Sequence, residues 1–120
     1  MTEIKHIFEP NPLACGQAVI AMVAGVDVNE VIKLVGKDRE TTLADMRFAL
    51  KNYGYLLAES RREASTVECL PGLALLSLET PKCWHWSLYC NGTVYDPEHG
   101  VLDSFPASNR KYYWEITKLK

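Results

Sequence analysis

The sequence lacks the features that mark several classes of protein. Its longest apolar run lies within residues 18–26, which is too short for a helix that spans a bilayer. The N-terminal segment MTEIKHIFEPNP has no apolar core, so no secretory signal is recognisable. Lys and Arg are scattered and the formal net charge is −2, which argues against the basic stripe of nucleic-acid-binding proteins. These absences predict a cytoplasmic protein that neither binds nucleic acid nor inserts into a membrane.

Close pairs of cysteines are also absent. The four cysteines stand at positions 15, 69, 83 and 90 and form no CxxC motif. In a cytoplasmic chain such cysteines are expected as free thiols. A zinc site made of Cys69, Cys83, His85 and Cys90 is an alternative that the spacing leaves open. Our prediction is that the protein has no metal and no organic cofactor.

Hydrophobic residues, by contrast, are plentiful enough for one folded domain over residues 1–120. They make up 48% of the chain and charged residues 23%, as in ordinary globular domains. A chain of 120 residues is long enough for a core and short for two domains.

The first half of the chain has the periodicity of three helices. Apolar residues recur every three or four positions, and each segment is followed by a glycine that can end it. The predicted helices are residues 15–24, 28–35 and 43–53, and the glycines are Gly25, Gly36 and Gly54. Asp27 suits the N-cap of the second helix, and Thr41 or Thr42 that of the third. The first helix is apolar on nearly every face, so we expect it to be central and buried.

The second half reads as strands. Short runs of alternating or continuous apolar residues are separated by turn residues and by the polar segment 61–72. The predicted strands are residues 55–60, 73–79, 85–90, 93–97 and 111–120. Helices followed by strands predict an α+β fold, with the helices packed on one face of an antiparallel sheet.

An Asn91-Gly92 turn fixes the register of one hairpin. The expected cross-strand pairs are Cys90–Thr93, Tyr89–Val94, Leu88–Tyr95 and Ser87–Asp96. His85 shares the face of Ser87 and is the diagonal neighbour of Asp96, about 7–8 Å away between Cα atoms. The turn therefore brings an imidazole within reach of a carboxylate that can orient it. An incidental polar pair on an exposed hairpin is the other interpretation.

A cysteine begins the first predicted helix, in the stretch PNPLACGQAVIAMVAG. Unpaired N–H groups and the positive end of the helix dipole favour a thiolate there. Cys15 alone is more typical of packing, but Cys15 beside His85 and Asp96 would form a nucleophile, a base and an orienting carboxylate. Gly16 is expected to leave room for a substrate backbone.

Three polar residues near these motifs have weaker expectations. His99 follows Pro97 into a loop and is the reserve candidate for the base. His6 lies in the N-terminal segment with no predicted partner. Gln17 is expected on the surface of the first helix.

The motifs ACGQAVIAMV and HWSLYCNGTVYDPEHG resemble the papain-like cysteine peptidases, and within them the bacteriocin-processing, double-glycine leader peptidase branch and its stand-alone relatives. The resemblance extends in element order over nearly the whole chain. It implies a papain-like fold in a bacterial or phage protein that acts on a peptide or protein substrate. Cys15 then matches the nucleophile, His85 the general base and acid, and Asp96 the orienting residue.

One residue departs from the pattern of that family. The family places a glutamine six residues before the cysteine, where its amide joins the cysteine N–H in the oxyanion hole, but this chain has Glu9. An ionised Glu9 cannot donate a hydrogen bond and would repel the oxyanion. Three alternatives follow: Asn11 supplies the amide, burial keeps Glu9 protonated, or the site has lost its activity.

Two functions are therefore predicted side by side. The first is a thiol peptidase, or a related acyl-transfer enzyme, that cleaves a peptide or amide bond through Cys15, His85 and Asp96. The second is an inactive peptidase-like module that recognises cargo or a host protein. In either case Trp84 and Trp86 flank the histidine and are expected to shield the site or line its cleft.

Overall fold

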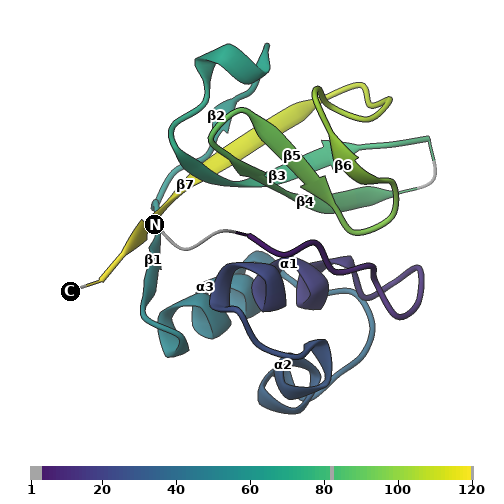
Figure 1. Ribbon diagram of the computed structural model, residues 1–120, viewed down its shortest axis with the longest axis vertical. Helices are drawn as coiled ribbons and strands as arrows, with labels where there is room; N and C mark the ends of the chain where they lie inside the picture. The colour runs from purple at the N-terminus through teal and green to yellow at the C-terminus, as the bar shows by residue number, and fades with distance from the viewer. Residues whose placement is uncertain (1–3, 82, 120) are drawn as a thin grey trace.

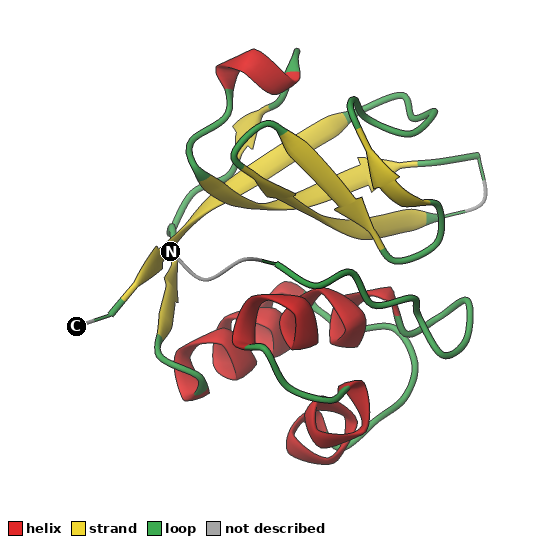
Figure 2. Ribbon diagram, viewed as in Figure 1, coloured by secondary structure: helices red, strands yellow, loops and turns green. Residues whose placement is uncertain are grey.

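Three helices lie together on one side of an antiparallel sheet in the computed structural model, which describes residues 4–81 and 83–119 (Figures 1 and 2). The helices are α1 (Cys15–Ala24), α2 (Val28–Val35) and α3 (Leu43–Asn52). The strands are β1 (Tyr55–Leu57), β2 (Arg62–Glu63), β3 (Leu73–Glu79), β4 (Trp84–Cys90), β5 (Thr93–Asp96), β6 (Gly100–Leu102) and β7 (Lys111–Lys118), with a short 3-10 helix η1 (Val67–Cys69). Their order in the sheet is β1-β7-β3-β4-β5-β6, and β2 pairs with β7. The predicted α+β architecture is confirmed.

Local sequence signals set the ends of the helices as predicted. Gly25 and Gly36 follow α1 and α2 in the left-handed conformation, with φ of +71° and +85°. The Asp27 side chain accepts a hydrogen bond from Asn29 N at the start of α2. Of the two threonines proposed for α3, Thr42 is the cap, and it forms a reciprocal capping box with Asp45.

The strands agree with the prediction less completely. The strand expected over residues 55–60 ends at Leu57 in β1. The polar segment 61–72 contains β2 and η1, and β6 follows the hairpin; none of these three was predicted, because each is only two or three residues long. The predicted last strand begins as β7 at Lys111, while its final residue, Lys120, lies outside the described residues.

The hairpin register is confirmed over three pairs. Asn91 and Gly92 both have positive φ, +45° and +94°, as a two-residue turn of this kind requires. The paired residues are Cys90–Thr93, Tyr89–Val94 and Leu88–Tyr95. The fourth expected pair, Ser87–Asp96, lies beyond the end of the ladder, although its side chains are hydrogen-bonded, from Ser87 Oγ to Asp96 Oδ2 at 2.8 Å.

The sheet has a separate hydrophobic core on each face. On the helix side, residues such as Leu75, Leu88 and Trp114 pack with α1 and α3. On the other side, Leu76, Leu78, Tyr89 and Val94 form a second core. Alternation along β4 and β5 puts His85, Ser87 and Asp96 on this second face, so the His–Asp pair and the helices lie on opposite sides of the sheet.

Gln17 is buried in the structure, and our prediction that it lies on the surface of α1 is wrong. Its side chain is fully buried, and its amide donates hydrogen bonds to the carbonyl oxygens of Lys37 and Arg39, each at 2.9 Å. These bonds tie α1 to the connector between α2 and α3. The prediction failed because the sequence pattern cannot show that an irregular connector packs over this helix face.

Helices α1 and α3 have ten residues each. Within residues 4–81 and 83–119, no helix combines the length and the apolar character needed to cross a bilayer.

Candidate active site

The site forms where the hairpin ladder between β4 and β5 stops. Continuing the register past Leu88–Tyr95 would set Trp86 opposite Pro97, with Trp86 N–H donating to the Pro97 carbonyl. Instead, Trp86 N–H donates to Cys15 Sγ at 3.4 Å, and the Pro97 carbonyl accepts from Glu9 N at 2.9 Å. The start of α1 and the segment before it therefore fill the opening between β4 and the chain that follows β5.

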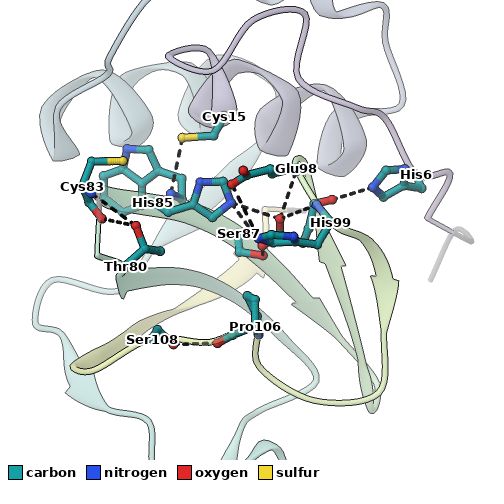
Figure 3. A network of polar contacts seen from close by, with 12 residues as sticks. His6, Cys15, Thr80, Cys83, His85, Ser87, Glu98, His99, Pro106 and Ser108 are labelled. Carbon is teal, nitrogen blue, oxygen red and sulfur yellow. Dashed lines mark hydrogen bonds and ion pairs between the residues drawn. The ribbon is translucent and has the colours of Figure 1, made fainter.

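This opening is how the thiol reaches an imidazole on the far face of the sheet. Cys15, the first residue of α1, points toward His85 on β4 (Figure 3). The sulfur of Cys15, a ring nitrogen of His85 and a carboxylate oxygen of Glu9 all lie within 4.8 Å of one another. Cys15 is 7% exposed and His85 4%, so the pair is largely shielded from water.

Asp96 holds the other side of the imidazole. Both of its carboxylate oxygens lie 3.1 Å from His85 Nε2, which leaves Nδ1 as the nitrogen available to Cys15. The carboxylate also accepts hydrogen bonds from Ser87 Oγ and from the backbone N–H groups of Glu98 and His99. With this set of donors the fully buried carboxylate stays ionised and fixed in place. We had not assigned Ser87 to the site, although the hairpin register already placed it opposite Asp96.

Charge and hydrogen bonding in this network shift both partners toward their ionised forms. Burial by itself disfavours a charged imidazole, but the hydrogen bonds and charges of Asp96 and Cys15 outweigh it and raise the pKa of His85 to about 10. Burial likewise favours a protonated carboxyl, but the bonds from His85 and the backbone keep the pKa of Asp96 below its usual value. At neutral pH the pair is therefore an imidazolium and a carboxylate.

Glu9 faces the same site from the N-terminal segment. Burial raises its pKa; His85 opposes this effect, while Glu98 and Asp96 reinforce it. Its Oε1 atom is buried and has no hydrogen-bond partner among the described residues. A carboxyl group thus lies where the family pattern calls for an amide donor.

Asn11 does not supply that amide. Its Nδ2 donates to the Asp38 carbonyl at 2.9 Å, and its Oδ1 accepts from Leu13 N at 2.9 Å. The side chain thereby closes a local turn before α1 and holds the connector after α2. Our proposal of Asn11 as an oxyanion donor is wrong in this structure, because both ends of its amide are already bonded elsewhere.

Gly16 has a different role from the one predicted. It is buried, and a Cβ built on it would overlap Thr41 Oγ1 and lie 2.9 Å from Met46 Sδ and 3.1 Å from Trp86 Cδ1. The missing side chain lets α1 approach β4 and the connector before α3, which brings Cys15 to His85. No room for a substrate remains at this position.

Replacing Gly16 with alanine is therefore expected to lower the free energy of unfolding by about 1–3 kcal/mol, because the new methyl group overpacks this contact. Urea denaturation of both proteins measures the loss. Gly72→Ala is the matched control, since its Cβ would meet only the end of the Asn91 side chain, at 3.3 Å. Equal denaturation midpoints for Gly16→Ala and the wild type would contradict this account of the glycine.

A cleft of about 280 Å³ opens beside the thiol. Both predicted tryptophans line it, together with Pro12, Leu13, Cys15, Glu40, Thr41, Ser77, Cys83 and His85. Trp86 is anchored by its indole N–H, which donates to the Thr41 carbonyl at 3.1 Å. Trp84 is 46% exposed and stacks on Tyr112 with 6.0 Å between ring centroids. The two indoles thus form part of the wall of the cleft that Cys15 lines.

The other two histidines lie outside the pair. The His99 side chain is half exposed, 3.5 Å from Glu98, and its ring centroid is 6.5 Å from that of His85. Contrary to the sequence expectation, His6 has a partner, because its Nε2 donates to the Asp96 carbonyl at 2.6 Å. The reserve assignment of His99 as the base finds no support in this geometry, because the nitrogen that faces Cys15 belongs to His85.

The zinc site that the spacing left open, made of Cys69, Cys83, His85 and Cys90, does not form in this structure. Cys90 belongs to the helix-side core, whereas His85 lies on the opposite face, and Cys69 and Cys83 are exposed. Across the described residues, the close group of three potential metal ligands is Glu9, Cys15 and His85.

No protein-family model and no curated protein matches the sequence. Solved structures do match. The peptidase domain of Streptococcus ComA, a bifunctional ABC transporter of a quorum-sensing pathway, is 14% identical with a TM-score of 0.66, and the match covers 98% of this chain and 100% of that domain.

A double-glycine-motif protease from an AMS/PCAT transporter, solved with a leader peptide, is 18% identical with a TM-score of 0.66, and the match covers 96% of this chain and 93% of that one. The chain therefore has the papain-like fold of these peptidase domains, as the sequence resemblance implied.

Proposed function

We propose that the protein is a cysteine peptidase that cleaves a peptide or amide bond with Cys15 as nucleophile. The observation that carries this proposal is the position of Cys15 Sγ beside a buried imidazole whose other nitrogen is held by Asp96. A nucleophile, a base and a group that orients the base are the three parts that thiol acyl transfer requires.

The reaction follows from these positions. The thiolate attacks the carbonyl carbon of a substrate in the cleft, and the developing oxyanion meets the Cys15 N–H, which has no intrahelical acceptor in the first turn of α1. The His85 imidazolium gives its proton to the leaving amine as the C–N bond breaks. Water then attacks the thioester while His85 takes its proton, and this step releases the acid and restores the Cys15 thiolate and the His85 imidazolium.

The comparisons support a peptide as the substrate. One neighbour was solved with a leader peptide and is named for a double-glycine motif. We extend this to the present chain and expect cleavage after a Gly-Gly sequence, because the wall of Trp84 and Trp86 and the crowding at Gly16 suit small residues beside the thiol.

A second candidate function, peptide binding without turnover, is favoured by one observation. Glu9 places an acceptor where an oxyanion needs a donor, and its buried Oε1 has no partner among the described residues. A module of this kind would keep the fold and the cleft and would recognise a cargo or host protein.

The reactivity of the thiols separates the two functions. With iodoacetamide at pH 6, we expect Cys15 to be alkylated quickly, because the His85 imidazole beside the sulfur can take its proton, and His85→Ala to slow this labelling about 10²-fold. Mass spectrometry of the digested protein assigns the label. Cys69 is the competing site, because hydrogen bonds from Thr66 and Ser65 lower its pKa and the residue is exposed.

The His85→Ala variant resolves that competition, because it changes the labelling of Cys15 and leaves that of Cys69 as it was. Cys83→Ser is the matched control, since Cys83 lines the same cleft but lies outside the close group of Glu9, Cys15 and His85. Slow labelling of Cys15 in both the wild type and His85→Ala would favour the binding module.

A further inference from the structure

We propose that Glu9, Cys15 and His85 form a binding site for Zn²⁺, and that zinc bound there switches the thiol off. The binding of zinc depends only on these three side chains. The switching rests on the proposed function, since only a catalytic thiol can be inhibited.

The three ligand atoms lie close enough together to bind one ion after a rearrangement of their side chains. They come from three separate segments, the N-terminal segment, α1 and β4, and lie within 4.8 Å of one another. In a tetrahedral zinc site the ligand atoms are about 3.4 Å apart, given bond lengths near 2.0–2.3 Å. The present separations, at most 4.8 Å, shorten to that value when the Glu9 and Cys15 side chains rotate about their own bonds.

The imidazole is held as a metal-binding histidine usually is. Asp96 accepts from Nε2, which leaves Nδ1 as the nitrogen near Cys15 and Glu9 and as the metal ligand once its proton is lost. The carboxylate is in turn fixed by Ser87 Oγ and two backbone N–H groups. A carboxylate–histidine pair of this kind fixes the tautomer and orients the ring in zinc sites.

Glu9 is the residue that distinguishes this site from an ordinary thiol–imidazole pair. Its Oε1 is buried and unpartnered within the described chain, and a buried polar atom without a partner calls for an unseen one. A cation bonded to this oxygen answers that need. The carboxylate and a thiolate together carry two negative charges, equal to the charge of Zn²⁺, and both oxygen and sulfur are ligands that zinc accepts.

Three protein ligands leave a fourth position for water, and two of the three, Cys15 and His85, line the cleft. The ion can therefore enter from the cleft, with water as the fourth ligand. Bound zinc takes the thiolate and the neutral imidazole, and the proton that these two groups share leaves to solvent. Neither a nucleophile nor a base is then free to act on a substrate.

Cobalt tests the ligand set on the full reduced chain. Co²⁺ replaces Zn²⁺ in tetrahedral sites and gives a near-ultraviolet band when a thiolate binds it, and displacement of that band by Zn²⁺ measures zinc affinity. We expect the band in the wild type and its loss in Cys15→Ser. Glu9→Gln and His85→Ala are each expected to weaken zinc binding at least ~10–100-fold, the loss typical of even outer-shell changes.

Matched controls separate this site from the surface thiols. Cys69→Ser and Cys83→Ser are expected to keep the band, and Glu98→Gln, which removes a nearby carboxylate outside the trio, to keep zinc affinity within a few-fold. In the wild type, zinc should also block iodoacetamide at Cys15, and a chelator should restore labelling. The same zinc affinity in Glu9→Gln and the wild type would overturn the proposal, as would a cobalt band that survives in Cys15→Ser.

The outcome for the metal and the outcome for catalysis can be told apart. A zinc site with the expected ligands in a protein whose metal-free Cys15 is unreactive would support the site and contradict the peptidase function. A reactive Cys15 in a protein whose zinc affinity is unchanged by Glu9→Gln would support the peptidase function and contradict the zinc site.

Discussion

Replacing Asp96 with asparagine is expected to lower the rate of amide hydrolysis by about 10²–10⁴-fold. Two backbone N–H groups, of Glu98 and His99, keep an oxygen at the position of Oδ1, so the new amide takes the position of Oδ2. That position lies 3.1 Å from His85 Nε2 and 2.8 Å from Ser87 Oγ. An asparagine N–H at that position points at His85 Nε2, so it disfavours a hydrogen on Nε2 and favours the tautomer with the hydrogen on Nδ1. In that tautomer Nδ1 cannot accept a proton from Cys15.

The same substitution removes the charge that stabilises the imidazolium. Asp96 is the main partner that raises the pKa of His85, so its loss lowers that pKa and weakens the thiolate–imidazolium pair. Because the carboxylate is fully buried, we also expect the variant to lose about 3–5 kcal/mol of folding stability.

Hydrolysis of a fluorogenic peptide amide that ends in Gly-Gly measures the rate, and thermal unfolding checks that the variant is folded at the assay temperature. Asp103→Asn makes the same chemical change on an exposed residue and is the control. A folded Asp96→Asn protein with unchanged activity would show that the carboxylate does not orient the base.

Glu9→Gln is expected to raise the rate of hydrolysis by about 10²–10³-fold, the amount that one oxyanion donor contributes. Glu9 already points into the site, within 4.8 Å of both Cys15 and His85 through its carboxylate oxygen. The glutamine amide has the same length and supplies the missing N–H donor. It also removes the negative charge that would repel an oxyanion.

The Gly-Gly peptide amide is again the probe, now with kcat and KM measured separately. A donor that acts only on the oxyanion raises kcat, whereas a change in substrate binding appears in KM. Glu68→Gln, on exposed η1, is the matched control. An unchanged kcat in Glu9→Gln would mean that the carboxyl group already donates as an acid, as its raised pKa allows.

Much of the fold and part of the site could be predicted from the sequence because the signals are local. Glycine stops and side-chain caps set the ends of the helices, and the Asn91-Gly92 turn set the pairing that brings His85 near Asp96. Signals of this kind act within a few residues, so they need no knowledge of the rest of the chain. The very short strands β2 and β6 were missed because two or three residues carry too little pattern.

The side-chain environments could not be predicted. Gln17, Asn11 and Gly16 all stand within a few residues of Cys15, yet their partners lie far along the chain, at residues 37–41, 46 and 86. Each of our expectations for them was wrong for that reason. A polar side chain finds whichever acceptor packing brings near it, and the sequence alone does not show which one that is.

By itself, then, the sequence determined that a turn couples an imidazole to a carboxylate, and that a thiol begins a buried helix. Only the tertiary structure decided how these meet, since the helices and the His85–Asp96 pair lie on opposite faces of the sheet. The ladder ends at Leu88–Tyr95, Trp86 N–H turns to the sulfur, and Glu9 N takes the Pro97 carbonyl. Proline cannot extend the ladder by donating a hydrogen bond, and the gap it leaves admits the thiol.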